Sequence, residues 1–445
     1  MFGLYGPGSA RDHACLLRLE KERDGRGIRF FNSGTNAILS GQSWAVAVPQ
    51  DNPTEAAKRA REEGARIILI TDAELLQAAA VDSFKSEGMT VLGPELHASQ
   101  VEGSKALMKD LVRDAGIPSP ESWLVKSAED AKTFLRDHWS PQAQFVIKTD
   151  RLIRDGKHRS MVPDSLSESL QDVDEEIEAL LKAHAAGGLI IERRVSGFET
   201  SVHVLWDGSS YVLFPPVRDY KQALDEDRGP NTNGAAALAF GGGFPPELEQ
   251  SLRRRIIEPA LDQLKKSGYG YRGFLYFGVM LTDEGPVLLE INVRPGNPEF
   301  AVLLELLASD FQNMIEHAAS GALHRISVTW HADRYAGCVF AMAADYPETE
   351  DVAAEPIEGL EEVVAEGNTV TEAVGLDKDG RLVVAGGRIA APVASARSIE
   401  TVKNQVYGAL SRIRFEGKHW RSDLGYGVAE ELFAARNHRE SSSLA

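Results

Sequence analysis

The sequence has little of what disulfide-linked or cysteine-metal proteins need. Its 445 residues contain only two cysteines, Cys15 and Cys338, which excludes a disulfide framework and a cysteine-rich metal site. No apolar run approaches the length that spans a membrane. Paired-histidine metal motifs and a G-x-S-x-G nucleophile turn are also absent from the sequence.

The sequence also has fewer positively charged than negatively charged residues. Lys and Arg total 48 against 66 Asp and Glu, which gives a formal net charge of −18. This balance argues against a general nucleic-acid binder and against binding to anionic membranes. The start, MFGLYGPGSARDH, lacks the apolar core and cleavage site of a secretory signal. We therefore expect a cytoplasmic protein with no nucleic-acid and no membrane partner.

The composition that remains is that of a globular α/β protein. Hydrophobic residues make up 43% and charged residues 26%, and the length indicates two to four packed units. Over the first hundred residues, apolar runs such as FGLY, AVAVPQ and RIILI alternate with helical patterns, which predicts a parallel sheet flanked by helices. The stretch PELHASQVEGSKALMKDLVRDAG then reads as one helix, ended by Gly116 and Pro118.

Further α/β units follow. Strands are predicted near FVIKTD and GLIIERRV, and again near ETSVHVLW, RGFLYFGVML and PVLLEINV. Between them, Asp219 to Gly234 is rich in Asp, Asn and Gly and is predicted to be an irregular loop. After His331, the strand-like runs CVFAMAA, EVVAEG and RLVVAGGRI precede a helix through SIETVKNQVYGALSRI, which predicts a separate terminal domain.

The stretch LLEINVRPGNPE carries the clearest chemical signal. Glu290, Asn292 and Arg294 occupy alternate positions at the end of an apolar strand, so their side chains share one face. Carboxylate and amide oxygens suit Mg²⁺, and a guanidinium suits phosphate oxygens. For one strand alone, ordinary surface polarity is the preferred explanation of the pattern.

Several other charged residues stand at the ends of predicted elements. Lys148 ends the strand FVIKTD, where an unpartnered ammonium is costly. Glu192 ends the strand of IIERRVSGFE and Glu199 follows a short turn, a pair suited to a base amino group and ribose hydroxyls. Lys105 opens a helix, and the basic loop RDGKHRS contains Lys157. Taken one at a time, each of these charged residues is explained as a solvated surface residue. Taken together, they favour one cleft that binds a nucleotide and a metal ion.

The glycine turn GPGSARDHA, at the amino end, follows a strand and opens a helix, as an anion-binding turn does. Arg11 stands where the third glycine of G-x-G-x-x-G belongs, so a dinucleotide-binding dehydrogenase is poorly supported.

The ordered motifs resemble a known family. VEGSKALMKDLVRDAGIPSP, DYKQALDEDRGPNTNG, RGFLYFGVMLTDEGPVLLEINVRPGNPE and FEGKHWRSDLG are similar, in this order, to phosphoribosylamine–glycine ligases of the ATP-grasp superfamily. The resemblance runs from the first strand to about Gly425. It implies an ATP-grasp fold with an amino-terminal parallel-sheet domain and a small carboxy-terminal domain. The expected parts are an amino-terminal domain 1–102, a lid subdomain with linker 103–193, a catalytic subdomain 194–330, a carboxy-terminal domain 331–431 and a disordered tail 432–445.

The resemblance also implies a reaction related to purine biosynthesis. ATP phosphorylates a carboxylate, and an amine attacks the acyl phosphate to give an amide, ADP and phosphate. The implied cofactors are ATP and Mg²⁺ (or Mn²⁺), and the implied partners are a small carboxylate and a small amine, bound by a monomer or homodimer.

The resemblance assigns roles to individual residues as well. Lys105 and Lys148 are implied contacts of the ATP phosphates, and Glu192 and Glu199 those of adenine and ribose. Lys157 stands in the basic loop that departs from the family pattern, and its side-chain charge is expected to compensate there for the missing glycines. Glu290 and Asn292 are the implied Mg²⁺ ligands, and Arg294 steadies the transferred phosphoryl group. Asp219, Lys221 and Asn231 belong to the carboxylate-substrate site.

Four departures from the family pattern bear on the substrates. The glycine-rich lid loop, roughly K-A-D-G-L-A-A-G-K-G, is KTDRLIRDGKHRS here. The motifs G-P-N-T-G-G-M-G and R-F-G-D-P-E read GPNTNGAA and RPGNPE, and G-P-E-A-P-L is replaced by Thr71 to Leu76. NSGTN still resembles the family's N-A-G-T turn. Substitutions clustered in these loops favour a paralogue whose acid and amine differ, and a non-catalytic nucleotide-binding regulator is the alternative.

Overall fold

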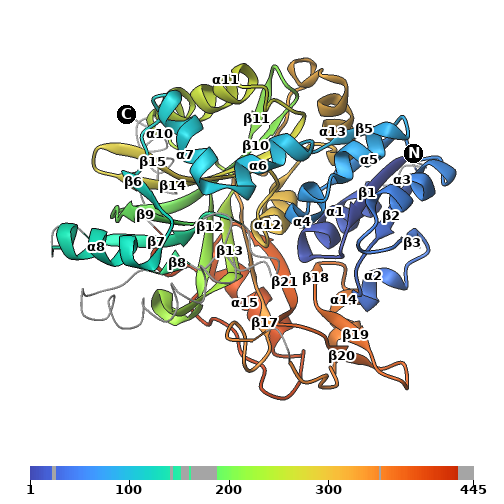
Figure 1. The fold of residues 1–445 in the computed structure, drawn as a ribbon. Helices are drawn as coiled ribbons and strands as arrows, with labels where there is room; N and C mark the ends of the chain where they lie inside the picture. The colour runs from blue at the N-terminus through green and yellow to red at the C-terminus, as the bar shows by residue number, and fades with distance from the viewer. Residues whose placement is uncertain (23–26, 141–143, 152–159, 162–187, 350–351, 429–445) are drawn as a thin grey trace, which may run out of the picture.

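A computed structural model of the protein describes residues 1–22, 27–140, 144–151, 160–161, 188–349 and 352–428 (Figure 1). Lys157 and the expected tail 432–445 lie outside these residues. The expected domain boundaries after residues 102, 193 and 330 stay predictions.

The amino-terminal part is the parallel α/β layer that the alternating pattern predicts. Its sheet has the order β3-β2-β1-β4-β5, with β1 at Phe2–Gly6, β2 at Ile28–Asn32, β3 at Ala45–Ala47, β4 at Ile67–Ile70 and β5 at Thr90–Leu92. The covering helices are α1 (Ala10–Lys21), α2 (Ala37–Ser40), α3 (Pro53–Glu62), α4 (Ala73–Gln77) and α5 (Ala80–Ser86). Strand β2 is an element that the sequence reading passes over.

Helices α6 (Leu96–Gly103) and α7 (Lys105–Asp114) lead to a small antiparallel sheet. Its order is β6-β9-β7-β8, with β6 at Ser122–Val125, β7 at Phe145–Thr149, β8 at Ser160–Met161 and β9 at Leu189–Arg193. Helix α8 (Ala128–His138) packs its buried Ala131 and Leu135 on this sheet. The strands predicted near FVIKTD and GLIIERRV are therefore confirmed.

A ten-stranded sheet forms the centre of the molecule (Figure 1). Its main path is β15-β14-β10-β12-β13-β16-β21-β17, while β11 pairs with β10 and β18 with β21. The strands are β10 (Phe198–Trp206), β11 (Tyr211–Leu213), β12 (Val217–Leu224), β13 (Arg228–Phe240), β14 (Gly273–Thr282), β15 (Gly285–Asn292), β16 (Tyr335–Val339), β17 (Ala341–Met342), β18 (Thr369–Thr371) and β21 (Arg388–Ala396). Because β13 pairs with β16, the sheet continues into the carboxy-terminal segment.

The remaining elements cover this sheet or extend from it. They are α10 (Pro246–Leu252), α11 (Glu258–Lys266), α12 (Glu299–Leu306), α13 (Phe311–Ser320), α14 (Leu360–Ala365), α15 (Ile399–Leu410) and the hairpin of β19 (Val374–Leu376) and β20 (Leu382–Val384). Helix α12 is buried along most of its length, in one core cluster with residues from β1, α1 and β16. This packing fixes the end of β15 against the amino-terminal sheet.

The structure corrects the expected loop between Asp219 and Gly234. Most of the segment belongs to the long hairpin of β12 and β13, joined by a short turn at Asp225–Asp227. Asp, Asn and Gly gather here because the hairpin contains two register shifts and a tight turn with left-handed residues at Glu226 and Asp227. Residues typical of turns therefore occur within a pair of strands, which packing stabilises.

Two smaller expectations also change. The stretch EVVAEG is the helix α14 and the turn after it, not a strand. The single helix predicted after β5 is two helices, because Ser104 is extended and caps α7 by accepting a hydrogen bond from the Leu107 amide. The break turns α7 so that Lys105 starts a new helix.

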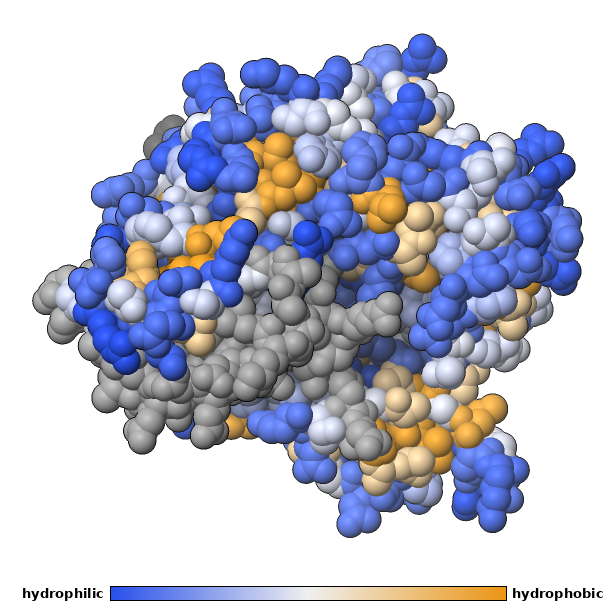
Figure 2. Space-filling view, in the orientation of Figure 1, coloured by the Kyte–Doolittle hydropathy of each residue, from blue (hydrophilic) through white to orange (hydrophobic). Residues whose placement is uncertain are grey.

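The outer surface is mainly hydrophilic on the face viewed, and hydrophobic side chains gather near β17 to β20 at the lower edge (Figure 2). A hollow lined by hydrophilic residues separates the amino-terminal part from the centre in this view. None of the helices in the described parts of the chain is long and apolar enough to cross a membrane.

Candidate active site

Glu290 and Asn292 lie at the end of β15, as the alternation predicts. Glu290 stands opposite Gly278 of β14, next to a register shift. A Cβ on residue 278 would lie 2.9 Å from Glu290 Cγ, so the glycine makes room for the carboxylate. Asn292 is 7% exposed. The strand therefore presents two side-chain oxygens of the kind that hard metal ions prefer, at one point of the sheet edge.

Two lysines from different elements surround the Glu290 carboxylate. Lys105 Nζ lies 3.4 Å from Glu290 Oε2, and Lys221 Nζ lies 3.9 Å from Oε1. Lys221 also pairs with Glu199 at 2.5 Å. Burial acts to lower the pKa of Lys221, but Glu199 and the nearby anionic groups outweigh it, and the pKa is raised well above its usual value. Lys221 is therefore a permanent cation.

A second charge cluster forms between β7, β9 and α7. Lys148 Nζ donates to Glu192 Oε2 at 2.8 Å, and Lys109 Nζ lies 3.2 Å from Glu192 Oε1. Lys109 also donates to Ser119 Oγ at 2.8 Å. Burial opposes ionisation of Glu192, which is 2% exposed, yet the two lysines keep its pKa below its usual value. The cluster carries two cations around one anion, so it has spare positive charge.

The start of α7 is tied to the end of β7. The Asp150 carboxylate accepts hydrogen bonds from Ser104 Oγ at 2.9 Å and from the Ala106 amide at 2.8 Å. The Asp150 carbonyl accepts from the Lys105 amide at 2.9 Å. Lys105 and Lys148 are therefore held on one framework, although they belong to different elements.

Arg294 is held just beyond the end of β15. Its Nε donates to Glu102 Oε1 at 3.1 Å, and its Nη2 lies 3.5 Å from Asn292 Oδ1. Glu102 is 4% exposed and also accepts from the Val293 amide at 2.9 Å. This buried carboxylate at the end of α6 fixes the direction of the guanidinium toward Asn292.

Asp219 lies on β12, and its Oδ1 is buried with no hydrogen-bond partner among the described residues. Burial and the neighbouring Glu299 raise the pKa of Asp219 well above its usual value. Asn231 is exposed and stands opposite Gln222 on the hairpin. The role of Asn231 in the carboxylate-substrate site stays a prediction.

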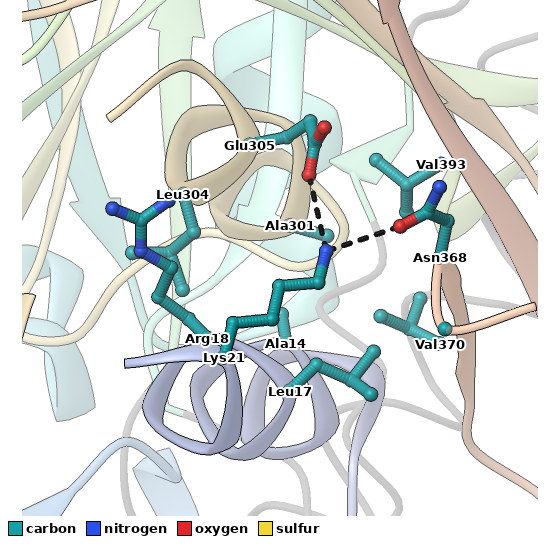
Figure 3. A pocket seen from close by; sticks show the side chains of 11 residues that line it. Ala14, Leu17, Arg18, Lys21, Ala301, Leu304, Glu305, Asn368, Val370 and Val393 are labelled. Carbon is teal, nitrogen blue, oxygen red and sulfur yellow. Dashed lines mark hydrogen bonds and ion pairs between the residues drawn. The ribbon is translucent and has the colours of Figure 1, made fainter. Parts of the chain in front are cut away.

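Open cavities elsewhere are not part of this cluster. A pocket between α1, α12 and the Gly367–Val370 segment is about 30 Å³ in volume, enough for about one water molecule, and Lys21 lies across it between Glu305 and Asn368 (Figure 3). A groove of about 770 Å³ borders β5 and α11. Neither is lined by a predicted site residue, so the charge cluster at the sheet edge is the better candidate.

Comparisons with known proteins agree with this architecture. The family model of the phosphoribosylglycinamide synthetase ATP-grasp (A) domain matches residues 103–300, and that of the C domain matches residues 336–427. The phosphoribosylamine–glycine ligase of Rhodopirellula baltica is 34% identical over 95% of this chain and 96% of its own length. The same enzyme of Caldanaerobacter subterraneus is 30% identical over 94% and 98%.

Comparison with solved structures finds the same architecture. The crystal structure of the Thermotoga maritima phosphoribosylamine–glycine ligase superposes with a TM-score of 0.75 at 27% identity, covering 95% of this chain and 99% of that one. The biotin carboxylase domain of Hydrogenobacter thermophilus 2-oxoglutarate carboxylase, solved with MgADP, has a TM-score of 0.66 at 17% identity over 94% and 91% of the two chains, which supports the fold alone.

The fold and the site define an ATP-grasp carboxylate–amine ligase, an enzyme that forms a C–N bond. More particularly, the chain belongs to the phosphoribosylamine–glycine ligase family. The family assignment and the fold class predicted from the sequence are confirmed. The comparisons do not support the interpretation that the substrates differ from those of the family, and they favour an enzyme over a non-catalytic regulator.

The sequence analysis did not identify some residues of the candidate site. Lys109 follows Lys105 by one helical turn, a spacing that places both on one helix face and would have signalled the lysine cluster. Glu102 carries no such signal, because its burial depends on the break between α6 and α7.

Proposed function

We propose that this enzyme joins glycine to phosphoribosylamine at the cost of one ATP. The γ-phosphoryl group passes to a glycine carboxylate oxygen, which leaves ADP. The amine nitrogen then attacks the acyl carbon, phosphate leaves, and the nitrogen loses a proton as the amide forms. The observation that carries the proposal is that Lys105 contacts Glu290 of β15 while the start of its helix is tied to Asp150, next to the strand of Lys148.

The donor set fits Mg²⁺ (or Mn²⁺) held partly by substrate. Among the described residues, no group of three or more His, Cys, Asp or Glu side chains is arranged to hold a metal ion. Glu290 and Asn292 supply two oxygen ligands, and Mg²⁺ commonly completes its shell with phosphates and water. When bound, the ion neutralises charge on the phosphates during transfer.

The chain's own residues supply positioning and charge. Lys105 and Lys148 take the ATP phosphates as counter-charges, and Arg294, aimed by Glu102, takes the transferred group. Glu192 is nearly inaccessible and bound to two lysines, so we assign it the task of holding Lys148 and Lys109 in place. Glu199 is left as the contact for ribose.

The amine substrate fits the carboxyl ends of the amino-terminal strands. The sheet order reverses between β1 and β4, the place where ligands bind in open α/β sheets. Arg11 donates to the Pro295 carbonyl at 2.8 Å and lies 3.7 Å from Asp72. Its buried Nε has no hydrogen-bond partner among the described residues. A phosphoribosyl group bound there would lie next to the loop that follows the metal strand.

ADP release tests the proposal directly. Purified protein receives Mg²⁺, ATP, glycine and freshly generated phosphoribosylamine. ADP formation that needs both substrates supports the proposal. ATP binding without turnover would refute this substrate pair, and a panel of amino acids and amines would then identify the substrates.

A further inference from the structure

The loop after the metal strand is joined to the carboxy-terminal segment by a buried network. Asn297 Nδ2 donates to Glu372 Oε2 at 2.8 Å. Glu372 Oε1 accepts two hydrogen bonds from Arg388, at 3.0 Å from Nε and 2.6 Å from Nη2. Glu372 directly follows β18, and Arg388 begins β21. The carboxy-terminal segment therefore reaches the substrate loops.

Arg388 anchors three backbone carbonyls in these loops. Its Nη1 donates to the carbonyls of Gly234 at 3.0 Å and Asn297 at 3.2 Å, and also to that of Asn233. The guanidinium is 5% exposed. One buried cation thus fixes both the hairpin β12–β13 and the loop that follows β15.

Glu372 determines which way the Asn297 amide faces. An ionised carboxylate only accepts hydrogen bonds, so the amide must turn its NH₂ group toward Glu372. Burial opposes ionisation of Glu372, but Arg388 and the Asn297 amide keep its pKa below the usual value. Glu372 is therefore an anion, and the Asn297 orientation is fixed by chemistry.

The other end of the amide is left without a partner. Asn297 Oδ1 is buried and makes no hydrogen bond among the described residues. A buried acceptor without a donor is unfavourable. Asn297 and Asp219, whose Oδ1 is also unpartnered, both border Gly234: a Cβ there would lie 2.7 Å from the Asn297 carbonyl oxygen and 3.3 Å from Asp219 Oδ1. Asn297 Oδ1 and Asp219 Oδ1 are thus two buried oxygens near Gly234 that have no hydrogen-bond donor among the described residues.

We infer that Glu372 and Asn297 are a matched pair, in which Glu372 is a positioning residue and Asn297 Oδ1 accepts a hydrogen bond from the amino group of the amino-acid substrate. The inference rests on the proposed function, since it names the substrate group that the pair receives. It also explains why an amide stands at position 297. A carboxylate there would face Glu372 at hydrogen-bond distance, and two such carboxylates cannot both stay ionised at low cost.

A double-mutant cycle of Asn297→Asp and Glu372→Gln tests the pair. Asn297→Asp should lower kcat/KM for glycine at least tenfold, with a rise in KM for glycine and little change in KM for ATP. The loss should shrink as pH falls, because one shared proton relieves the repulsion. In the double variant, the new amide at position 372 donates to the new carboxylate at position 297 and still accepts from Arg388. Activity should therefore recover at least tenfold relative to Asn297→Asp.

Each arm has a control. Asn297→Ala removes the acceptor without adding charge, so KM for glycine should rise with no new pH dependence, even if Asn297→Asp fails to fold. Glu358→Gln changes an exposed carboxylate paired with Arg414 and should behave as the unmodified enzyme. The melting temperature of every variant separates loss of fold from loss of function.

The outcomes separate the two proposals. If the unmodified enzyme forms no ADP with glycine and phosphoribosylamine, the proposed function fails first. If it is active but Asn297→Asp stays within twofold of it, or the double variant only multiplies the two losses, the matched pair is overturned while the function stands. Equal rises in KM for ATP and glycine would also overturn it.

Discussion

Lys109 Nζ lies 3.2 Å from Glu192 Oε1, on the side of the carboxylate opposite to Lys148. Lys109 is 6% exposed, and burial lowers its pKa to about 8. The second lysine of α7 is thus a titratable support of the proposed nucleotide site. Loss of its charge removes one of the two cations that contact the Glu192 carboxylate.

The first prediction concerns the alkaline limb of activity. Above about pH 8 Lys109 loses its proton, Glu192 loses one of its two cations, and KM for ATP should rise. The same titration should not weaken the fold. Between the folded pKa near 8 and the usual 10.5, the unfolded chain binds more protons, so this group's contribution to stability increases with pH. Steady-state kinetics and thermal melts over pH 7 to 10 measure the two effects.

Lys109→Arg supplies the control, because a guanidinium stays charged over this range. The rise in KM should move to higher pH in that variant, and Lys109→Met should show the raised KM at every pH. An identical alkaline limb in the enzyme and in Lys109→Arg would contradict the assignment.

The second prediction concerns Glu290 of β15, the proposed metal ligand. Glu290→Gln removes the charge but keeps the shape, and we expect kcat to fall by about a hundredfold or more, as for the loss of a group that stabilises transferring charge. Lys105 and Lys221 then have one anionic partner fewer to attract them away from the ATP phosphates. ATP binding should therefore be retained. Calorimetric titration with ATP and ADP release measure these quantities separately. Chelation of the divalent ion should abolish turnover of the unmodified enzyme, and unchanged turnover in Glu290→Gln would exclude a role for this carboxylate.

The third prediction concerns Gly278, which stands opposite Glu290 on the neighbouring strand β14. Gly278→Ala places a Cβ about 2.9 Å from Glu290 Cγ, so the carboxylate must move and kcat should fall. Gly408→Ala in α15 is the matched control, because its added Cβ meets no heavy atom within 4 Å apart from its chain neighbours and the nearby backbone of its own helix. That change should leave activity unchanged and stabilise the helix by about 0.5–1 kcal/mol. Equal activities of the two variants would show that Glu290 tolerates displacement.

The fourth prediction concerns a buried ion pair. Arg388→Ala leaves Glu372 without its cation and three carbonyls without a donor, and breaking a buried pair on one side costs about 3–5 kcal/mol. Arg414→Ala breaks a pair whose side chains are 69% and 70% exposed, where about 0–1 kcal/mol is expected. Denaturant unfolding of both variants compares the two. Similar free energies of unfolding would mean that the buried network contributes little to stability.

The sequence allowed the chemistry of strand ends to be predicted, because strand periodicity alone places Glu290 and Asn292 on one face. Lys148 was also predictable, since an ammonium at the end of an apolar strand needs a partner. Local patterns could not reveal Glu102, Glu372 or Arg388, whose partners come from distant parts of the chain. The hairpin β12–β13 was mistaken for a loop because its turn residues and register shifts carry loop composition.

The pairing of β13 with β16 has a consequence for anyone who divides this protein. Residues Ala236–Phe240 of β13 are hydrogen-bonded to Tyr335–Val339, so a chain cut after residue 330 would expose a bare row of amide and carbonyl groups beside an apolar surface. Such an edge recruits other strands. The two matched family regions are therefore poor units for transplantation: a chimera that exchanges the carboxy-terminal segment must bring a strand that completes the sheet, or the recipient will aggregate before its active site can be assayed.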